Sequence, residues 1–439
     1  MSDPRGRRGR GRAVPLGWAF NSLRAWSRLG LGGSRGSLSL RAVALAAAGL
    51  AATGCGGTSG SSTPAGQQGS FDPGSVTAEP TALAALGEKI FHDESLSAGG
   101  RMSCATCHDP SRAFAQPSAS GVSFGGAGLD QPGVRNAPSL MYTARTPQFF
   151  FADDGTPTGG FDRDGRALDL ADQAVRPFIT SFEMANTSPA EVVDKLSRAT
   201  YADDFRAQFG QQSFTDPDQA FLDARVAIEA YETESPEFQP FTSQYDYFLA
   251  GRATLSAAQM RGLALYNNPQ KGNCSACHPS ARGSGGEPPM FTDFTYDNLG
   301  VPRNTAIAAN DDPTYFDLGL CGPFRTDLAA RTDLCGAFKV PTLRNIALSA
   351  PYFHNGRFQT LTQVVGFYVR RDTNPEEWYP LGADGLVQKF DDLPAQYRGN
   401  VNTEEVPYNR QPGDQPALSP AEIDDVVAFL QTLTDGYQP

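Results

Sequence analysis

Two copies of one short cysteine–histidine pattern constrain this chain more than any other feature. The pattern is C-x-x-C-H, and it occurs at Cys104, Cys107 and His108 and again at Cys274, Cys277 and His278. This spacing lets two thiols form thioether bonds with one porphyrin, while the next residue supplies an imidazole nitrogen to its iron. Two unrelated cysteine pairs, or one zinc site built from both, are the alternatives. Zinc gives no reason for a histidine directly after each second cysteine. The sequence therefore predicts two covalently bound haem c groups.

Residues 1–54 have the composition of an export signal. They contain nine arginines and a single acidic residue, Asp3, and they end in an apolar run over residues 42–53 that is too short to span a membrane stably. Cys55 follows, and residues 55–78 form a tether rich in Gly, Ser and Thr. This arrangement resembles a bacterial lipoprotein signal in which Cys55 is lipidated; a plain signal peptide is the alternative. We expect a periplasmic protein that meets a membrane only through a lipid anchor.

The charge balance and the remaining cysteines bound the function further. The formal net charge is −12, and it is more negative once the arginines of the leader are set aside. A protein with this negative charge has no electrostatic reason to bind nucleic acid, although its surface suits a basic redox partner. Cys321 and Cys335 flank a short polar loop, and in an oxidising compartment they are expected to form a disulfide, with two free thiols as the alternative.

Apolar periodicity predicts helices and no convincing strand. Ala82, Leu86 and Ile90 lie on one face of a helix that should end near His92, and residues 167–177 should form another helix that stops at Pro177. Capping patterns predict helices that begin after Ser188, Asp216, Ser256, Thr360 and Ser419. The predicted fold class is all-α, with two cytochrome c-like haem domains, residues 79–250 and residues 251–439, and long loops.

Several further motifs accompany the haem motifs in a recognisable order. They are residues 86–93, 164–166, 173–184, 338–345 and 351–356. With them, the chain resembles the bacterial di-haem cytochrome c peroxidase family, including its MauG-type branch, over about residues 79–434. The resemblance implies that the N-terminal domain carries the peroxide-reactive haem and that the C-terminal domain carries an electron-transfer haem.

The first haem is expected to have an open side. The chain has four histidines, and none lies between His108 and His278, where many relatives carry a second ligand for the first iron. The resemblance implies that Glu183 transfers the proton that heterolytic O–O cleavage requires, that Gln173 orients the peroxide, and that Pro177 is the distal proline. Without the resemblance, Glu183 and Gln173 would be interpreted as solvated loop and helix residues.

The second haem is expected to have a tyrosine ligand opposite His278. In the family, a ligand follows the motif at residues 351–356; it is Met in the usual peroxidases and Tyr in the MauG-type branch, and here the matching residue is Tyr368. Leu361, Val365 and Tyr368 share one helix face, so the phenol should point inward. A core tyrosine bonded to a carbonyl or a haem propionate is the alternative. His354 is expected to serve the propionates.

Two more implications concern the region between the domains. The resemblance implies a calcium ion held by the side-chain oxygen of Asn136 and the carbonyls of Ser349 and Pro351. The family commonly has a tryptophan before the Asp-Gly-Arg sequence at residues 164–166, as an electron relay between the haems. Here that residue is Arg163, which cannot be oxidised usefully, so the inter-haem route is left open.

Three functions agree with these features. The first is a peroxidase that reduces hydrogen peroxide with electrons from a small c-type cytochrome or cupredoxin. The second is a MauG-type oxidant that uses strongly oxidised haem to modify a protein or a small molecule. The third is a two-haem electron carrier without enzymatic activity, against which the open first haem argues, because a carrier needs both irons capped.

Overall fold

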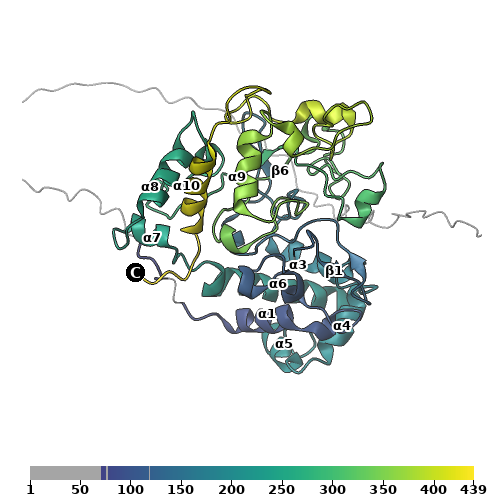
Figure 1. Cartoon of the computed structure of the whole chain (residues 1–439). Coiled ribbons are helices and arrows are strands. Elements are labelled where there is room, and N and C mark those ends of the chain that lie inside the picture. Colours follow the sequence, from purple (N-terminus) through teal and green to yellow (C-terminus); the bar gives the residue numbers. More distant parts are fainter. Residues whose placement is uncertain (1–70, 76–77, 118) are drawn as a thin grey trace, which may run out of the picture. The chain divides into compact units, whose positions relative to one another are not determined.

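The computed structural model of the protein describes residues 71–75, 78–117 and 119–439. The predicted leader, Cys55 and the tether up to residue 70 lie outside the described residues. All described residues belong to one compact unit, in which helices dominate and strands are short (Figure 1). None of the helices in these ranges is long and apolar enough to cross a membrane.

The helices and strands have the following bounds. The helices are α1 (Ala82–His92), α2 (Cys104–Cys107), α3 (Leu170–Ile179), α4 (Pro189–Ser197), α5 (Ala202–Phe209), α6 (Pro217–Glu234), α7 (Gln244–Leu249), α8 (Ala257–Asn267), α9 (Leu361–Arg370) and α10 (Pro420–Gln431). Three antiparallel pairs of two-residue strands complete the set: β1 (Phe124–Gly125) with β2 (Gln131–Pro132), β3 (Phe150–Phe151) with β4 (Pro157–Thr158), and β5 (Tyr296–Asp297) with β6 (Phe338–Lys339). The expectation of a mostly helical fold is confirmed.

The predicted helix starts are confirmed by their capping bonds. The five N-cap side chains accept hydrogen bonds from first-turn backbone N–H groups, and they are Ser188, Asp216, Ser256, Thr360 and Ser419. The bounds predicted for α3 are wrong at both ends. This helix begins at Leu170 because Asp169 caps it, and it continues past Pro177 to Ile179. Proline is tolerated there because it lies in the last turn and removes only one helical hydrogen bond.

Each half of the chain contains one close helix crossing at a glycine. α1 crosses α6 at Gly87, where a Cβ atom would lie 1.8 Å from the carbonyl oxygen of Ala227. α8 lies beside α10 (Figure 1), and at Gly262 of α8 a Cβ atom would lie 1.9 Å from the carbonyl oxygen of Asp425 on α10. In both halves the glycine-bearing helix precedes a haem motif, so the motif repeat extends to the packing around it.

The hydrophobic core has two main clusters that follow the order of the sequence. One contains residues between Leu86 and Phe241, and the other contains residues between Tyr245 and Leu433. Arg344 links them, because its guanidinium donates to the buried Asp246 carboxylate at 2.9 Å and also lies over the rings of Tyr142 and Phe241 from the first cluster. The separation of the clusters agrees with two domains, but the boundary near residue 250 and the two-domain haem arrangement remain predictions.

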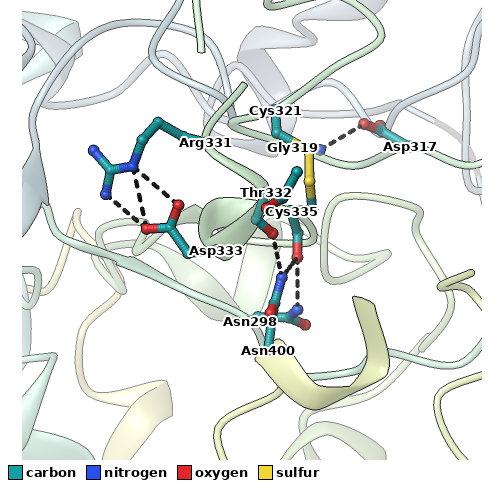
Figure 2. The surroundings of a disulfide bond; sticks show 9 residues. All are labelled: Asn298, Asp317, Gly319, Cys321, Arg331, Thr332, Asp333, Cys335 and Asn400. Carbon is teal, nitrogen blue, oxygen red and sulfur yellow. Dashed lines mark hydrogen bonds and ion pairs between the residues drawn. A yellow bond between two sulfur atoms is a disulfide. The ribbon is translucent and has the colours of Figure 1, made fainter. Parts of the chain in front are cut away.

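A disulfide closes the loop that precedes β6. Figure 2 shows this bond between Cys321 and Cys335, the pairing expected for an exported chain. The side-chain amides of Asn298 and Asn400 both donate to the carbonyl oxygen of Cys335 at 3.1 Å. At the other end of the loop, Asp317 accepts a bond from the backbone of Gly319. The loop therefore holds Asp317 in place between the two halves of the chain.

Candidate haem sites

The first haem motif presents two free thiols and an oriented imidazole. Cys104 and Cys107 begin and end α2, and neither forms a disulfide. Nδ1 of His108 lies 3.1 Å from the carbonyl oxygen of Phe114 and 3.0 Å from that of Pro138. Carbonyls only accept hydrogen bonds, so Nδ1 carries the proton and Nε2 keeps its lone pair for a metal.

The second motif repeats this arrangement. Nδ1 of His278 lies 2.8 Å from the carbonyl oxygen of Phe291, and Cys274 and Cys277 are free. Burial lowers the pKa of both His108 and His278, which keeps the imidazoles neutral, as metal ligation requires.

The zinc alternative can be tested against the same residues. Within the described ranges, no group of three or more His, Cys, Asp or Glu side chains could hold a metal ion, so the two motifs do not build one zinc site together. Each motif separately provides the thiols and the imidazole that a covalently bound haem requires. The residues therefore fit haem c.

Glu183 lies in a tight turn that follows α3. Its backbone N–H donates to the carbonyl of Thr180, and its own carbonyl accepts from the N–H of Gly126 at 2.8 Å. The turn rests against β1 at Gly125, where a Cβ atom would approach the carbonyl oxygen of Phe182 to 2.3 Å. A side chain at residue 125 would displace the turn, so this glycine helps to determine where Glu183 points.

The carboxyl group of Glu183 has the electrostatic properties of a proton shuttle. Burial raises its pKa to about 7, and a hydrogen bond from the side chain of Thr180 offsets part of that rise. Its charge also raises the pKa of the Cys104 and Cys107 thiols, so the carboxyl lies close to the first haem motif. A group with a pKa near neutrality can both accept and return a proton.

Gln173 and Pro177 lie four residues apart on α3 and therefore on one helix face. Both are half-buried. The carbonyl of Pro177 accepts a hydrogen bond from the N–H of Met184, which links Pro177 to the Glu183 turn. The carboxamide of Gln173 has no hydrogen bond within the described ranges. The structure thus brings Pro177 to the turn and places Gln173 one helical turn earlier on the same face.

Tyr368 lies on α9 beside the second haem motif. Leu361 and Val365 are buried on its helix face, as predicted, and its ring stacks on Phe353 with the centroids 5.9 Å apart. Burial raises the pKa of its phenol well above the usual value, and the second motif's thiols reinforce the shift. Its hydroxyl makes no hydrogen bond to any described residue, so the carbonyl-bonded alternative is not observed.

His354 and His92 occupy different environments. His354 is buried, and its ring stacks on Phe338 with the centroids 3.8 Å apart and the planes 5° from parallel. Its Nε2 lies 3.8 Å from Oδ2 of Asp392, and its carbonyl accepts from the N–H of Asn136 at 2.8 Å. His92 is exposed at the end of α1, in agreement with a structural role. Service of the haem propionates by His354 remains a prediction.

Two residues near the haem motifs were not found from the sequence. Tyr408 lies next to Tyr368, with the ring centroids 6.0 Å apart, and is a second buried phenol near the second motif. Glu232 on α6 is only 2% exposed, and burial raises its pKa to about 8. Its Oε2 has no hydrogen-bond partner within the described ranges, and its charge raises the pKa of Cys104. No motif or spacing marks either residue, because their contacts come from distant segments.

The side-chain oxygen of Asn136, predicted to bind calcium, has another partner. Nη2 of Arg163 donates to Oδ1 of Asn136 at 2.5 Å, and Nε of Arg163 donates to the carbonyl of Asn136 at 2.8 Å. Between Ser349 and Pro351, the carbonyl of Ala350 accepts from Arg112. The side-chain oxygen predicted as a calcium ligand is thus bonded to a guanidinium, and the arrangement does not fit the expected ion.

The fold and these sites define a class: a mostly helical protein with two c-type haem motifs, of which the first has an acid–base group beside it. The sequence model of the di-haem cytochrome c peroxidase family matches residues 81–254. The methylamine utilization protein MauG of Paracoccus denitrificans is 35% identical over 373 residues, which cover 82% of this chain and 90% of that protein. The chain belongs to the MauG-type di-haem cytochrome c peroxidase family, and it is an oxidoreductase with two c-type haems.

Other relatives agree. The cytochrome c551 peroxidase of Pseudomonas aeruginosa is 28% identical over 358 residues, covering 81% of this chain and 79% of that protein. The crystal structure of the diheme peroxidase BthA from Burkholderia thailandensis is 42% identical, with a TM-score of 0.75, and the match covers 84% of this chain and 89% of that one. Peroxidase or MauG-like oxidase activity follows from the family, as do peroxide as the oxidant and a cytochrome as the electron donor.

Proposed function

We propose that the protein is a periplasmic di-haem peroxidase. In this proposal the N-terminal domain, residues 79–250, reduces hydrogen peroxide, and the C-terminal domain, residues 251–439, relays electrons from a small c-type cytochrome or a cupredoxin. The observation that carries the proposal is the position of Glu183, which lies close to the first haem motif with a pKa of about 7. An electron carrier has no use for an acid–base group at that place.

The chain's own residues manage the protons of the reaction. The bound haems supply the two electrons that reduce one peroxide, with two protons, to two waters. Glu183 accepts the proton of the nearer peroxide oxygen and returns it to the departing oxygen, which leaves as water. Gln173, whose carboxamide is not otherwise engaged, orients the peroxide by hydrogen bonds. Pro177 has no N–H, so it presents an apolar surface beside the reacting oxygens.

A second candidate is a MauG-type oxidant, favoured by the environment of Tyr368. Its hydroxyl has no hydrogen-bond partner among the described residues and lies close to the thiols of the second motif. An anionic oxygen ligand stabilises oxidised iron, whereas methionine raises the potential and suits an electron reservoir. Tyrosine at this place therefore favours long-lived oxidising equivalents that are used on a protein or a small-molecule substrate.

Peroxide added to the resting ferric protein separates these functions. A rapid change in the Soret band, followed by fast oxidation of a reduced small cytochrome, supports the peroxidase. A long-lived oxidised spectrum with poor cytochrome turnover supports the MauG-type oxidant. The absence of any spectral response supports the electron carrier and contradicts both enzymatic proposals.

The proposed location rests on the residues outside the described ranges. Because haem c is attached after export and Cys55 follows an apolar run, we place the protein in the periplasm with a lipid tether at Cys55. A Cys55→Ala variant is expected to appear in the soluble periplasmic fraction, whereas the wild type stays with the membranes. A wild type that is already soluble in the periplasm contradicts the tether.

A further inference from the structure

Arg163 engages both oxygens of Asn136. Its Nε donates to the backbone carbonyl and its Nη2 donates to Oδ1, so two nitrogens of one planar guanidinium bond to the same residue. Asn136 is only 2% exposed, and its Oδ1 is the atom expected to bind calcium. A guanidinium and a calcium ion cannot both occupy the space in front of this oxygen.

The other predicted ligands lie beside a second guanidinium. Nη2 of Arg112 donates to the carbonyl of Ala350 at 2.5 Å, and its Nε donates to the carbonyl of Gln116 at 3.0 Å. Ala350 separates the two residues whose carbonyls were expected to contact the ion, Ser349 and Pro351. A positive side chain therefore reaches each of the two segments that the family resemblance assigns to calcium.

The carboxylates nearby are already neutralised. Arg135 pairs with Asp164 at 2.7 Å and with Asp317 at 2.6 Å, and Arg166 pairs with Asp164 at 3.0 Å and with Asp162 at 3.2 Å. Burial and the charge of Arg135 lower the pKa of Arg163 to about 10, so its guanidinium still carries a full charge at neutral pH. A divalent cation added here would meet this charge without a free carboxylate to balance it.

We propose that the guanidinium of Arg163 takes the place of the calcium ion between the two halves of this chain, so that the protein needs no calcium. One residue thus accounts for two departures from the family pattern, because Arg163 also stands where the relay tryptophan is expected. Arginine suits this role, because its rigid guanidinium can donate hydrogen bonds to two oxygens at once. Its charge also does not depend on pH in the neutral range.

Arg163 also acts as a positioning residue for the first haem. It holds Asn136, and two residues later the carbonyl of Pro138 orients His108. The N–H of Asn136 donates to the carbonyl of His354, so the same short segment contacts both halves of the chain. The charge of Arg163 further lowers the pKa of His108, which places the guanidinium within electrostatic reach of that imidazole.

The first test uses the wild-type holoprotein. After treatment with EGTA, isothermal titration with CaCl2 is expected to show no binding tighter than about 1 mM, the weak end of extracellular calcium sites. The thermal unfolding midpoint and the first haem's ferric EPR signal should be the same in EGTA and in calcium. A stoichiometric calcium site, or a midpoint that falls in EGTA, overturns the proposal without reference to turnover.

The second test removes the charge with Arg163→Gln. The variant should unfold at least about 2 °C lower than the wild type, because a buried charged hydrogen-bond pair is lost. The first haem's reduction potential should fall, because a nearby positive charge disfavours the ferric state. Calcium in the millimolar range should restore part of both losses, since the Asn136 oxygens are then accessible. Arg163→Lys should retain the potential better than Arg163→Gln does.

A matched control distinguishes this effect from general calcium binding. Arg303 is another part-buried guanidinium; it donates to the backbone carbonyls of Asn310, Asp312 and Tyr315 and also pairs with Asp392 at 3.1 Å. Arg303→Gln should lose stability without calcium rescue and without a change in the first haem's potential. If Arg163→Gln behaves like this control, or leaves midpoint and potential unchanged, the substitution of arginine for calcium is refuted.

Discussion

Replacing the carboxyl group of Glu183 gives the sharpest test of the first site. If this group accepts the peroxide proton, the rate of the first step follows the ionised fraction of Glu183. With a pKa of about 7, raised by burial, that fraction falls from about nine-tenths at about pH 8 to about one-tenth at about pH 6. The observed rate constant should therefore decrease about tenfold across this range, with its midpoint near neutrality.

Two variants separate the proton transfer from other causes of pH dependence. Glu183→Gln should lower the rate about 100-fold or more and remove the midpoint, because an amide cannot accept the proton. Thr180→Val removes the hydrogen bond that favours the ionised carboxyl, so the pKa of Glu183 rises and the midpoint moves to higher pH. The exposed acid Asp130, replaced by Asn, serves as the control and should change neither rate nor midpoint.

The assay is stopped-flow mixing of the resting ferric protein with peroxide at constant ionic strength, followed at the Soret band. Haem content and the resting spectrum of each variant must equal those of the wild type before rates are compared. If the Glu183→Gln rate is within twofold of the wild-type rate at about pH 8, Glu183 does not transfer the peroxide proton, and the alternative of a solvated loop acid holds. A midpoint that stays fixed in Thr180→Val shows that another group titrates.

Four further outcomes are expected. Cys107→Ser and Cys277→Ser should each remove one covalent haem, measured by haem stain and mass after denaturation, and full haem content in both would refute the two-haem assignment. Tyr368→Phe should change the spectrum and potential of the second haem only, whereas unchanged values exclude tyrosine as its ligand. Burial raises the pKa of Glu232 to about 8, so the contribution of this residue to stability is greatest at acid pH and is lost as pH rises from the unfolded pKa towards 8. Relative to Glu232→Gln, the wild type's free energy of unfolding should fall by about 3 kcal/mol between about pH 5 and about pH 7.5. Gly87→Ala should lower the free energy of unfolding by about 1–3 kcal/mol by forcing α1 away from α6, as denaturant titration would show, and an unchanged midpoint would contradict the close crossing.

Local chemistry made some features predictable from the chain alone. A capping side chain bonds to a backbone N–H two or three residues away, so Ser256 or Thr360 marks a helix start without any knowledge of the fold. The end of α3 was less predictable, because Pro177 costs little in a last turn and the sequence does not show which turn is last.

The family motifs identified which residues to examine at the site, but not their state. Glu183 is a plain loop acid in the sequence, and its pKa of about 7 arises only because the folded chain buries its carboxyl group. The same holds for Glu232. In the sequence it is an ordinary helix residue, and only the folded structure shows that it is buried, with one carboxyl oxygen that has no partner among the described residues.

The two haem motifs, the helix starts and the family were thus determined by the sequence itself, because each depends on residues a few positions apart in the chain. The tertiary structure decided which groups from distant segments form hydrogen bonds with one another. The sequence shows that Arg163 replaces an expected tryptophan, whereas only the folded chain shows that its guanidinium bonds to Asn136, at the side-chain oxygen expected to bind calcium. Hydrogen bonds between distant segments follow from how those segments pack, and no local spacing encodes them.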